Sequence, residues 1–143
     1  GETDDQFGEL YDFVADVRFD RLGAFAYSRE EGSAAALMPD QVPVELARER
    51  LEALEELQRG IAEERNRGLI GGRIEALVDR AANGSPAQGR TRGDCPEIDQ
   101  VVYFQESRKA PLHSGDLIEV EVTGVDDLDL VGRPVGFSAA RPE

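Results

Sequence analysis

Residues 89–104 read GRTRGDCPEIDQVVYF, and this stretch says most about how the chain folds. It places Arg90 and Arg92 ahead of a Gly-Asp turn and then runs into an alternating apolar segment. Arginine forks suit phosphate or carboxylate ligands. Residues at i and i+2 of an extended chain point to the same side, so the pattern predicts one binding face for both arginines. The alternative is that they pair with acids of the same loop: Asp94, Glu97 and Asp99.

Outward from this loop, the chain alternates with a period of two. Residues 73–79 (RIEALVD) and 117–123 (LIEVEVT) are the clearest examples, with Val120 and Val122 expected inward and Glu119 outward. Shorter apolar runs occupy residues 100–105 and 128–132, while 81–88 is expected to be a loop and 134–143 a loose tail. Several short strands at this spacing predict a small, closed antiparallel β-barrel.

The N-terminal part predicts helices instead. Thr3 and Gln6 match a capping box ahead of an apolar face at helical spacing, which ends near Phe19. Residues 21–28 (RLGAFAYS) alternate and predict a strand. Residues 43–67 predict a second, long helix with a narrow apolar stripe and a Gly68 cap.

These elements predict an α+β chain in four parts. Residues 1–38 are expected to be an incomplete α/β remnant, because a helix followed by a strand needs a parallel sheet around it. The connecting helix should span 39–67, the barrel 68–134 and the tail 135–143. An incomplete sheet predicts an apolar face that packs on a neighbouring chain or stays mobile, and this face includes Phe7, Leu10, Val14 and Phe25.

Composition excludes several function classes. The 143 residues carry a net charge of −14 and lack a basic stripe, which disfavours nucleic acid and favours a basic partner. One cysteine (Cys95) and one histidine (His113) cannot build a metal cluster within one chain. No phosphate-binding loop, signal peptide or membrane-spanning run is present, so a cytoplasmic location is expected.

Three stretches, in order, resemble radical-SAM methylthiotransferases of the RimO type. They are GETDDQFGELYDFV, FDRLGAFAYSREEGSAAA and DQVPVELARERLEALEELQRGIAEERNRGLIG, followed by a barrel with a PEID run that resembles the family's TRAM domain. The resemblance implies an enzyme that adds a methylthio group to an aspartate of a small-subunit ribosomal protein. That family uses S-adenosylmethionine and two 4Fe–4S clusters.

The same resemblance limits what this chain does. The family's cluster-binding cysteines, including a CxxxCxxC motif, lie in portions that this sequence lacks, so we expect a non-catalytic C-terminal fragment without its own cofactor. It would dock a basic ribosomal protein through the barrel loop, and the residues expected to take part are Arg90, Arg92, Asp94, Glu97, Asp99 and Tyr103. Residues expected to remain from the barrel mouth near the cosubstrate are Glu2, Thr3, Tyr27 and Ser28.

Charge helps to choose between branches of the family. Residues 68–143 hold 8 basic and 13 acidic residues, a net charge of −5. A TRAM domain that binds tRNA should be basic, so the ribosomal-protein branch is favoured. Two alternatives stay open: a tRNA methylthiotransferase fragment, and a non-enzymatic interaction domain that packs on another chain.

Overall fold

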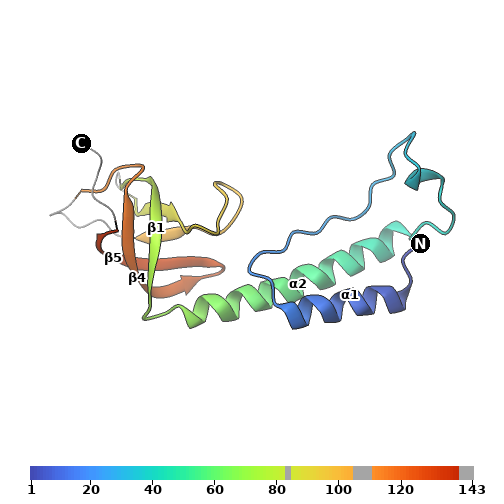
Figure 1. Ribbon diagram of the computed structural model, residues 1–143, viewed down its shortest axis with the longest axis horizontal. Coiled ribbons are helices and arrows are strands. Elements are labelled where there is room, and N and C mark those ends of the chain that lie inside the picture. The colour runs from blue at the N-terminus through green and yellow to red at the C-terminus, as the bar shows by residue number, and fades with distance from the viewer. Residues whose placement is uncertain (83–84, 105–110, 139–143) are drawn as a thin grey trace. The chain divides into compact units, whose positions relative to one another are not determined.

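A computed structural model describes residues 1–82, 85–104 and 111–138 (Figure 1). The chain divides into two compact units, Gly1–Ala62 and Glu63–Glu143, which we call the helical unit and the barrel unit. Helix α2 (Val44–Gly68) contributes its first part to the helical unit and its last turns to the barrel unit.

Helix α1 (Asp4–Val17) begins as the sequence predicts. Thr3 accepts a hydrogen bond from the Gln6 backbone, and the Gln6 side chain accepts one from the Thr3 backbone, which completes the capping box. The helix ends at Arg18, whose left-handed φ of 54° closes the last turn on the Val14 carbonyl.

The two long helices run side by side in the same direction (Figure 1). Near the start of both helices, the Arg50 guanidinium of α2 donates a hydrogen bond to Asp4 of α1. Beyond the end of α1, the Gln58 amide of α2 donates to the Phe19 carbonyl at 3.0 Å. This packing buries Leu54 and Ile61 of the predicted stripe. It also buries Val14, which is 2% exposed; the expectation that Val14 stays uncovered was therefore wrong, because α2 already supplies part of the cover.

Residues 21–28 do not form the predicted strand. They run as an extended segment back along the helices, and the turn η1 (Ala35–Leu37) precedes α2 (Figure 1). An alternating pattern sets which side chains share a face, but a strand also needs hydrogen-bonding neighbours. The described part of the helical unit contains no strand to supply them.

The barrel unit closes a sheet of five described strands in the order β1-β2-β3-β5-β4. The strands are β1 (Arg73–Arg80), β2 (Ala87–Arg90), β3 (Val102–Phe104), β4 (Leu117–Asp126) and β5 (Asp129–Phe137). Four pairings are antiparallel as predicted, while β3 and β5 pair in parallel. Val120 and Val122 point inward in β4, again as predicted.

Two boundaries of the barrel differ from expectation. Strand β2 lies partly in the expected loop, because its sequence AQGR has no apolar alternation that would predict a strand. Close packing against neighbouring strands requires a small residue at Gly89. A Cβ on Gly89 would lie 2.5 Å from the Leu77 carbonyl oxygen and 3.2 Å from Phe104 Cε1. Strand β5 continues to Phe137, into the expected tail, because β4 offers it a full-length antiparallel partner.

The barrel core is continuous and apolar. Its buried members are Ala76, Val78, Ala87, Val102, Phe104, Leu112, Ile118, Val120, Val122 and Leu130. None of the helices in the described ranges is long and apolar enough to cross a membrane.

Candidate functional site

The loop between β2 and β3 is built around two aspartates. Asp94 is buried, and its Oδ2 accepts hydrogen bonds from the Thr91 backbone at 3.1 Å and from the Thr91 hydroxyl at 2.5 Å. Asp99 Oδ2 accepts a hydrogen bond from the Cys95 backbone at 2.7 Å. Two short side chains thus fix two successive turns, so both carboxylates shape the loop.

The far end of this loop is tied to the turn between β4 and β5. The Val101 backbone donates to Asp129 Oδ1 at 2.7 Å, and the Leu130 backbone donates to the Val101 carbonyl at 2.9 Å. Asn66, from the last turns of α2, donates to the Leu128 carbonyl at 2.8 Å and to Gln100 Oε1 at 3.0 Å. The loop is therefore held by the helix and the turn together.

The tip of the loop exposes one large apolar side chain between two acids. Ile98 is 83% exposed and follows Glu97, which is exposed and held at a left-handed φ of 64°. Sequence reasoning missed Ile98. The available signal was an isolated apolar residue inside a turn made of Pro, Glu and Asp.

The two arginines of the loop do not share one extended face. Arg90 ends β2 and makes an ion pair with Asp79 of β1. Arg92 lies in the turn that follows, is exposed, and makes no ion pair with the described part of the chain. Tyr103 is half-buried in β3, between two inward-facing neighbours, and stands across from Gln88 and Val131.

Charges on the barrel are arranged unevenly. On the strands, arginines face glutamates: Arg73 lies 3.2 Å from Glu119, and Arg133 lies 2.7 Å from Glu121. In the loop and the β4–β5 turn, Asp99 and Asp129 instead accept hydrogen bonds from neutral backbone groups. We call this region the acidic end; its members are Glu97, Asp99, Asp126, Asp127 and Asp129.

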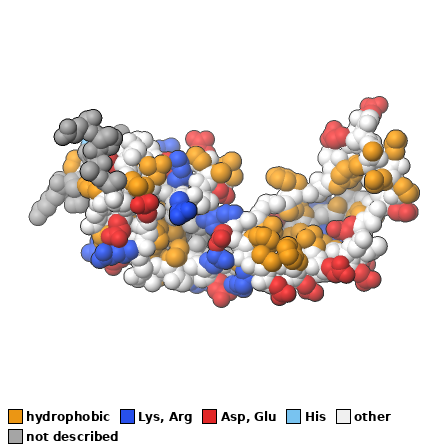
Figure 2. Space-filling view, viewed as in Figure 1, with side chains coloured by type: hydrophobic (Ala, Val, Ile, Leu, Met, Phe, Trp, Pro, Cys, Tyr) orange, Lys and Arg blue, Asp and Glu red, His pale blue; other side chains and the backbone are white. Residues whose placement is uncertain are grey.

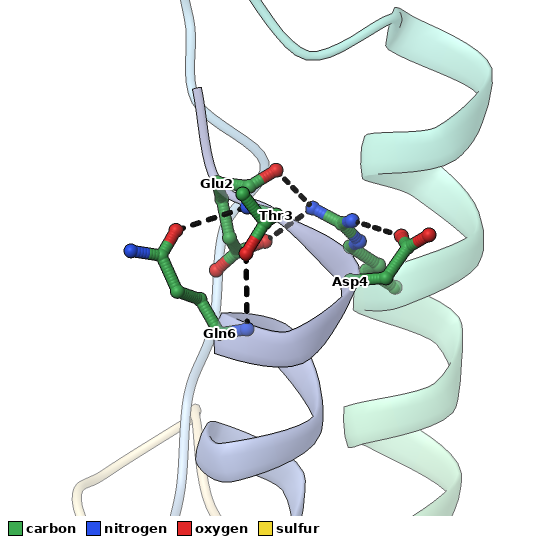
Figure 3. Close-up of polar contacts among 5 residues, drawn as sticks. Glu2, Thr3, Asp4 and Gln6 are labelled. Atoms are coloured by element: carbon green, nitrogen blue, oxygen red, sulfur yellow. Dashed lines mark hydrogen bonds and ion pairs between the residues drawn. The ribbon is translucent and has the colours of Figure 1, made fainter.

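A second polar cluster lies at the start of the helical unit (Figure 3). The Arg50 guanidinium donates to Asp4 Oδ1 at 2.6 Å, to Glu2 Oε2 at 2.7 Å and to the Glu2 carbonyl at 3.1 Å. It also lies 5.3 Å from the centre of the Phe7 ring. The hydrogen bond to Asp4 and the contacts with Glu2 raise the pKa of Arg50, against the opposing effect of desolvation.

The four residues expected at a barrel mouth are spread over this unit. Glu2 binds Arg50, Thr3 caps α1, and the Ser28 hydroxyl donates to Glu30 Oε1 at 3.1 Å. Tyr27 lines an apolar cavity of about 580 Å³ between the extended segment and the helices. Figure 2 shows apolar side chains gathered on the helical unit among acidic ones. No sequence pattern singled out Arg50 for this role, because it is one charge among many on α2.

The described residues do not fit the cofactors of the resembled family. A 4Fe–4S cluster is held by several cysteine thiolates. The sequence has one cysteine, and the described ranges contain no group of three or more His, Cys, Asp or Glu side chains placed to hold a metal ion. No chemical step is therefore assigned to an iron–sulfur cluster in this chain.

Comparison with known proteins identifies the barrel and its relatives. Residues 70–135 match the TRAM domain family. The chain is 42% identical over 135 residues to the ribosomal protein uS12 methylthiotransferase RimO of Desulfitobacterium hafniense, covering 94% of this chain and 30% of the relative. It is 43% identical over 134 residues to the protein of the same name from Bacteroides thetaiotaomicron, covering 93% of this chain and 30% of the relative. The match to the Stenotrophomonas maltophilia protein is 42% over 142 residues, 99% of this chain and 31% of the relative. The chain thus spans about 30% of the length of these relatives.

Proposed function

We propose that this chain, which is similar to RimO-type methylthiotransferases over most of its own length, corresponds to a C-terminal segment of such an enzyme and is its substrate-docking part. The parent enzyme would add a methylthio group to an aspartate of ribosomal protein uS12. In this proposal the reaction takes place on the remaining part of the enzyme, and the barrel unit holds the basic ribosomal protein. We place the complex in the cytoplasm.

The distribution of charge on the barrel unit carries this proposal. On the strands, three glutamate or aspartate side chains have an arginine partner, and these pairs contribute little net field. At the acidic end, Asp99 and Asp129 accept hydrogen bonds from neutral backbone groups, which carry no compensating full charge. A field of one sign attracts a partner of the opposite sign and orients it before contact. A lysine-rich and arginine-rich protein fits this end, whereas a phosphate backbone is repelled by it.

The loop tip supports the same proposal. Asp94 and Asp99 fix the loop through their hydrogen bonds, so little conformational entropy is lost when a partner binds. Ile98, which lies between Glu97 and Asp99 in the sequence, offers an exposed apolar contact. Glu97, Arg92 and Tyr103 remain the candidates for direct contact, since the acids that shape the loop and Arg90 already have partners in the barrel unit.

In the helical unit, we propose that Glu2, Thr3, Tyr27 and Ser28 lie near the cosubstrate in the parent enzyme. The support is that Glu2 and Tyr27 both line the apolar cavity, and that Thr3 and Ser28 are their neighbours in the sequence. We also propose that residues 1–38 are the part of the α/β domain that this chain retains, and that the chain by itself associates through them.

The test is binding of the purified chain to uS12 and, in parallel, to tRNA, each over a salt series. Glu97→Arg reverses one exposed charge at the acidic end. We expect this variant to weaken uS12 binding roughly three- to tenfold at low salt, because one exposed attraction becomes a repulsion. Glu31→Arg is the matched control, since Glu31 is exposed in the helical unit and the change in net charge is identical.

The outcomes distinguish docking at the acidic end from a general effect of charge and from tRNA binding. Binding to uS12 that weakens with salt and with Glu97→Arg, but not with Glu31→Arg, supports docking at the acidic end. Equal effects of the two variants would mean that only total charge matters, and the site assignment fails. Binding to tRNA alone would overturn the charge argument and favour the tRNA-modifying branch.

A further inference from the structure

Ile98 is a large apolar residue that the loop between β2 and β3, residues 91–101, leaves in solvent; we call this segment the docking loop. Ile98 belongs neither to the barrel core nor to the apolar residues packed against it, so truncating its side chain should cost the fold little. A single exposed apolar residue is common on protein surfaces. A role for Ile98 must therefore rest on how the loop holds it and on what lies beside it.

The docking loop holds Ile98 inside a closed turn. The Cys95 backbone donates to Asp99 Oδ2 at 2.7 Å, and the Asp99 backbone donates to the Cys95 carbonyl at 3.3 Å. Within this turn Pro96 fixes one φ angle, and Glu97 takes a left-handed φ of 64° that residues other than glycine adopt rarely. Such a conformation persists only where its surroundings enforce it. The turn is thus formed in the free chain, and Ile98 needs little ordering when a partner binds.

Carboxylates flank Ile98 on both sides in the sequence, and they select the kind of partner. Glu97 is exposed, while Asp99 is half-buried and helps to close the turn. A lysine or arginine side chain has an aliphatic stem and a positive end, so it can cover an apolar residue and reach a neighbouring carboxylate at once. A neutral apolar partner would gain nothing from the flanking acids, and a phosphate backbone would be repelled by them.

We propose that Ile98 is the apolar anchor of the docking loop: it packs on the aliphatic stem of a lysine or arginine of the ribosomal protein, and the charged end of that side chain reaches Glu97. This inference rests on the proposed docking function and names the contact that carries it. The contact has two parts. The ionic part is exposed and weakens as salt screens it, whereas the burial of Ile98 does not depend on charge. The loop therefore keeps a share of its affinity that salt does not remove.

The first test is the affinity of the purified 143-residue chain for uS12 over a salt series, with Ile98→Ala and a control variant. We expect Ile98→Ala to weaken binding roughly five- to thirtyfold, as for an anchor residue of an interface, and by the same factor at every salt concentration. Ile70→Ala is the matched control, because Ile70 is the same residue type in the barrel unit, is 49% exposed and lies outside the docking loop. It should leave the affinity for uS12 unchanged.

The second test asks whether one basic side chain contacts both residues. It compares Ile98→Ala, Glu97→Gln and the double variant at low salt. If the stem packs on Ile98 and the charged end reaches Glu97, the loss of Ile98 also removes part of what Glu97 contributes. The double variant should then weaken binding by less than the product of the two separate factors. A factor equal to that product would overturn the shared contact.

The outcomes separate the anchor from the docking function on which it rests. Binding that Glu97→Gln weakens and Ile98→Ala leaves unchanged would overturn the anchor, while docking at the acidic end would stand. An effect of Ile98→Ala that shrinks as salt rises, or that Ile70→Ala equals, would also overturn the anchor. No binding of uS12 by the unaltered chain would overturn both. Urea unfolding of Ile98→Ala should match that of the unaltered chain; a lower midpoint would assign the lost affinity to the fold and overturn the anchor.

Discussion

Asn66 should be one of the most sensitive positions of the barrel unit, although it lies on a helix. It is 3% exposed, and its amide nitrogen donates to the Leu128 carbonyl at 2.8 Å and to Gln100 Oε1 at 3.0 Å. Asn66→Ala removes both donors and leaves two acceptor oxygens without this partner. A buried polar group left without its partner costs about 1–3 kcal/mol. Leu128 and Gln100 are only half-buried, so water can replace part of the loss, and we expect about 2 kcal/mol in total.

Hydrogen exchange of amides in β1 and β4 measures this change directly, because the slowest amides report unfolding of the barrel unit. A loss of about 2 kcal/mol should speed their exchange roughly thirtyfold. Arg67→Ala is the control on the next residue. Arg67 makes only an exposed ion pair with Glu63, at 2.9 Å, so its removal should cost less than about 1 kcal/mol.

Asn66→Asp sharpens the test through pH. It places a buried carboxylate against two acceptor oxygens, and this environment should raise the pKa of the new side chain in the folded protein. An acid whose folded pKa is raised destabilises most when ionised, so the variant should regain stability as pH falls through that pKa. The reasoning would be refuted if Asn66→Ala left hydrogen exchange in β1 and β4 unchanged. It would also be refuted if the stability of Asn66→Asp did not depend on pH.

Two further predictions use matched pairs of variants. Gly89→Ala should destabilise the barrel by about 1–3 kcal/mol in urea unfolding, because the new Cβ meets the Leu77 carbonyl and the Phe104 ring. Gly124→Ala is the control and should be close to neutral, because its Cβ meets no atom within 4 Å. Equal effects of the two variants would contradict the packing argument. Arg50→Met should increase hydrogen exchange at the start of α1 because it removes three hydrogen bonds, whereas Arg48→Met, on the exposed face of the same helix, should leave exchange unchanged.

The elements that the sequence predicts well are those with local causes. The capping box of Thr3 and Gln6 involves residues three apart, and both of its hydrogen bonds are present. The alternation in β1 and β4 assigns inward and outward side chains correctly, because one face of each strand is buried and the other is solvated. Long helices and alternating strands carry their own evidence.

The elements that it predicts poorly depend on partners far along the chain. Strand β2 is short and has no pattern of its own; it is a strand because β1 and β3 pair with it on either side. The close approach of Leu77 and Phe104 then requires a glycine at position 89. Residues 21–28 show the opposite case, with the pattern of a strand and no neighbour to pair with. Local periodicity sets which side chains share a face, while pairing decides whether a strand exists.

The candidate site divides in the same way. The loop was found from its composition, but the roles inside it depend on contacts that composition does not reveal. Asp94 and Asp99 bind backbone and hydroxyl donors within four residues, and Arg90 binds Asp79 on the neighbouring strand. Asn66 and Arg50 gave no sequence signal, since each is one polar residue on a helix rich in them.

The two units should recognise partners by different physics. The barrel unit has a closed sheet, whereas the described part of the helical unit has no strand. In the barrel unit every described strand has two neighbours, so no backbone edge is free and a partner must be recognised by loops and side-chain charge. Attraction of that kind weakens as salt screens it. In the helical unit the free groups belong to the backbone of 22–28 and the apolar side chains beside it. Self-association through this segment, as proposed, would have to overcome the repulsion of two acidic chains and should therefore strengthen as salt is added. One salt series on the same sample therefore separates the two surfaces, since uS12 binding and self-association should change in opposite directions.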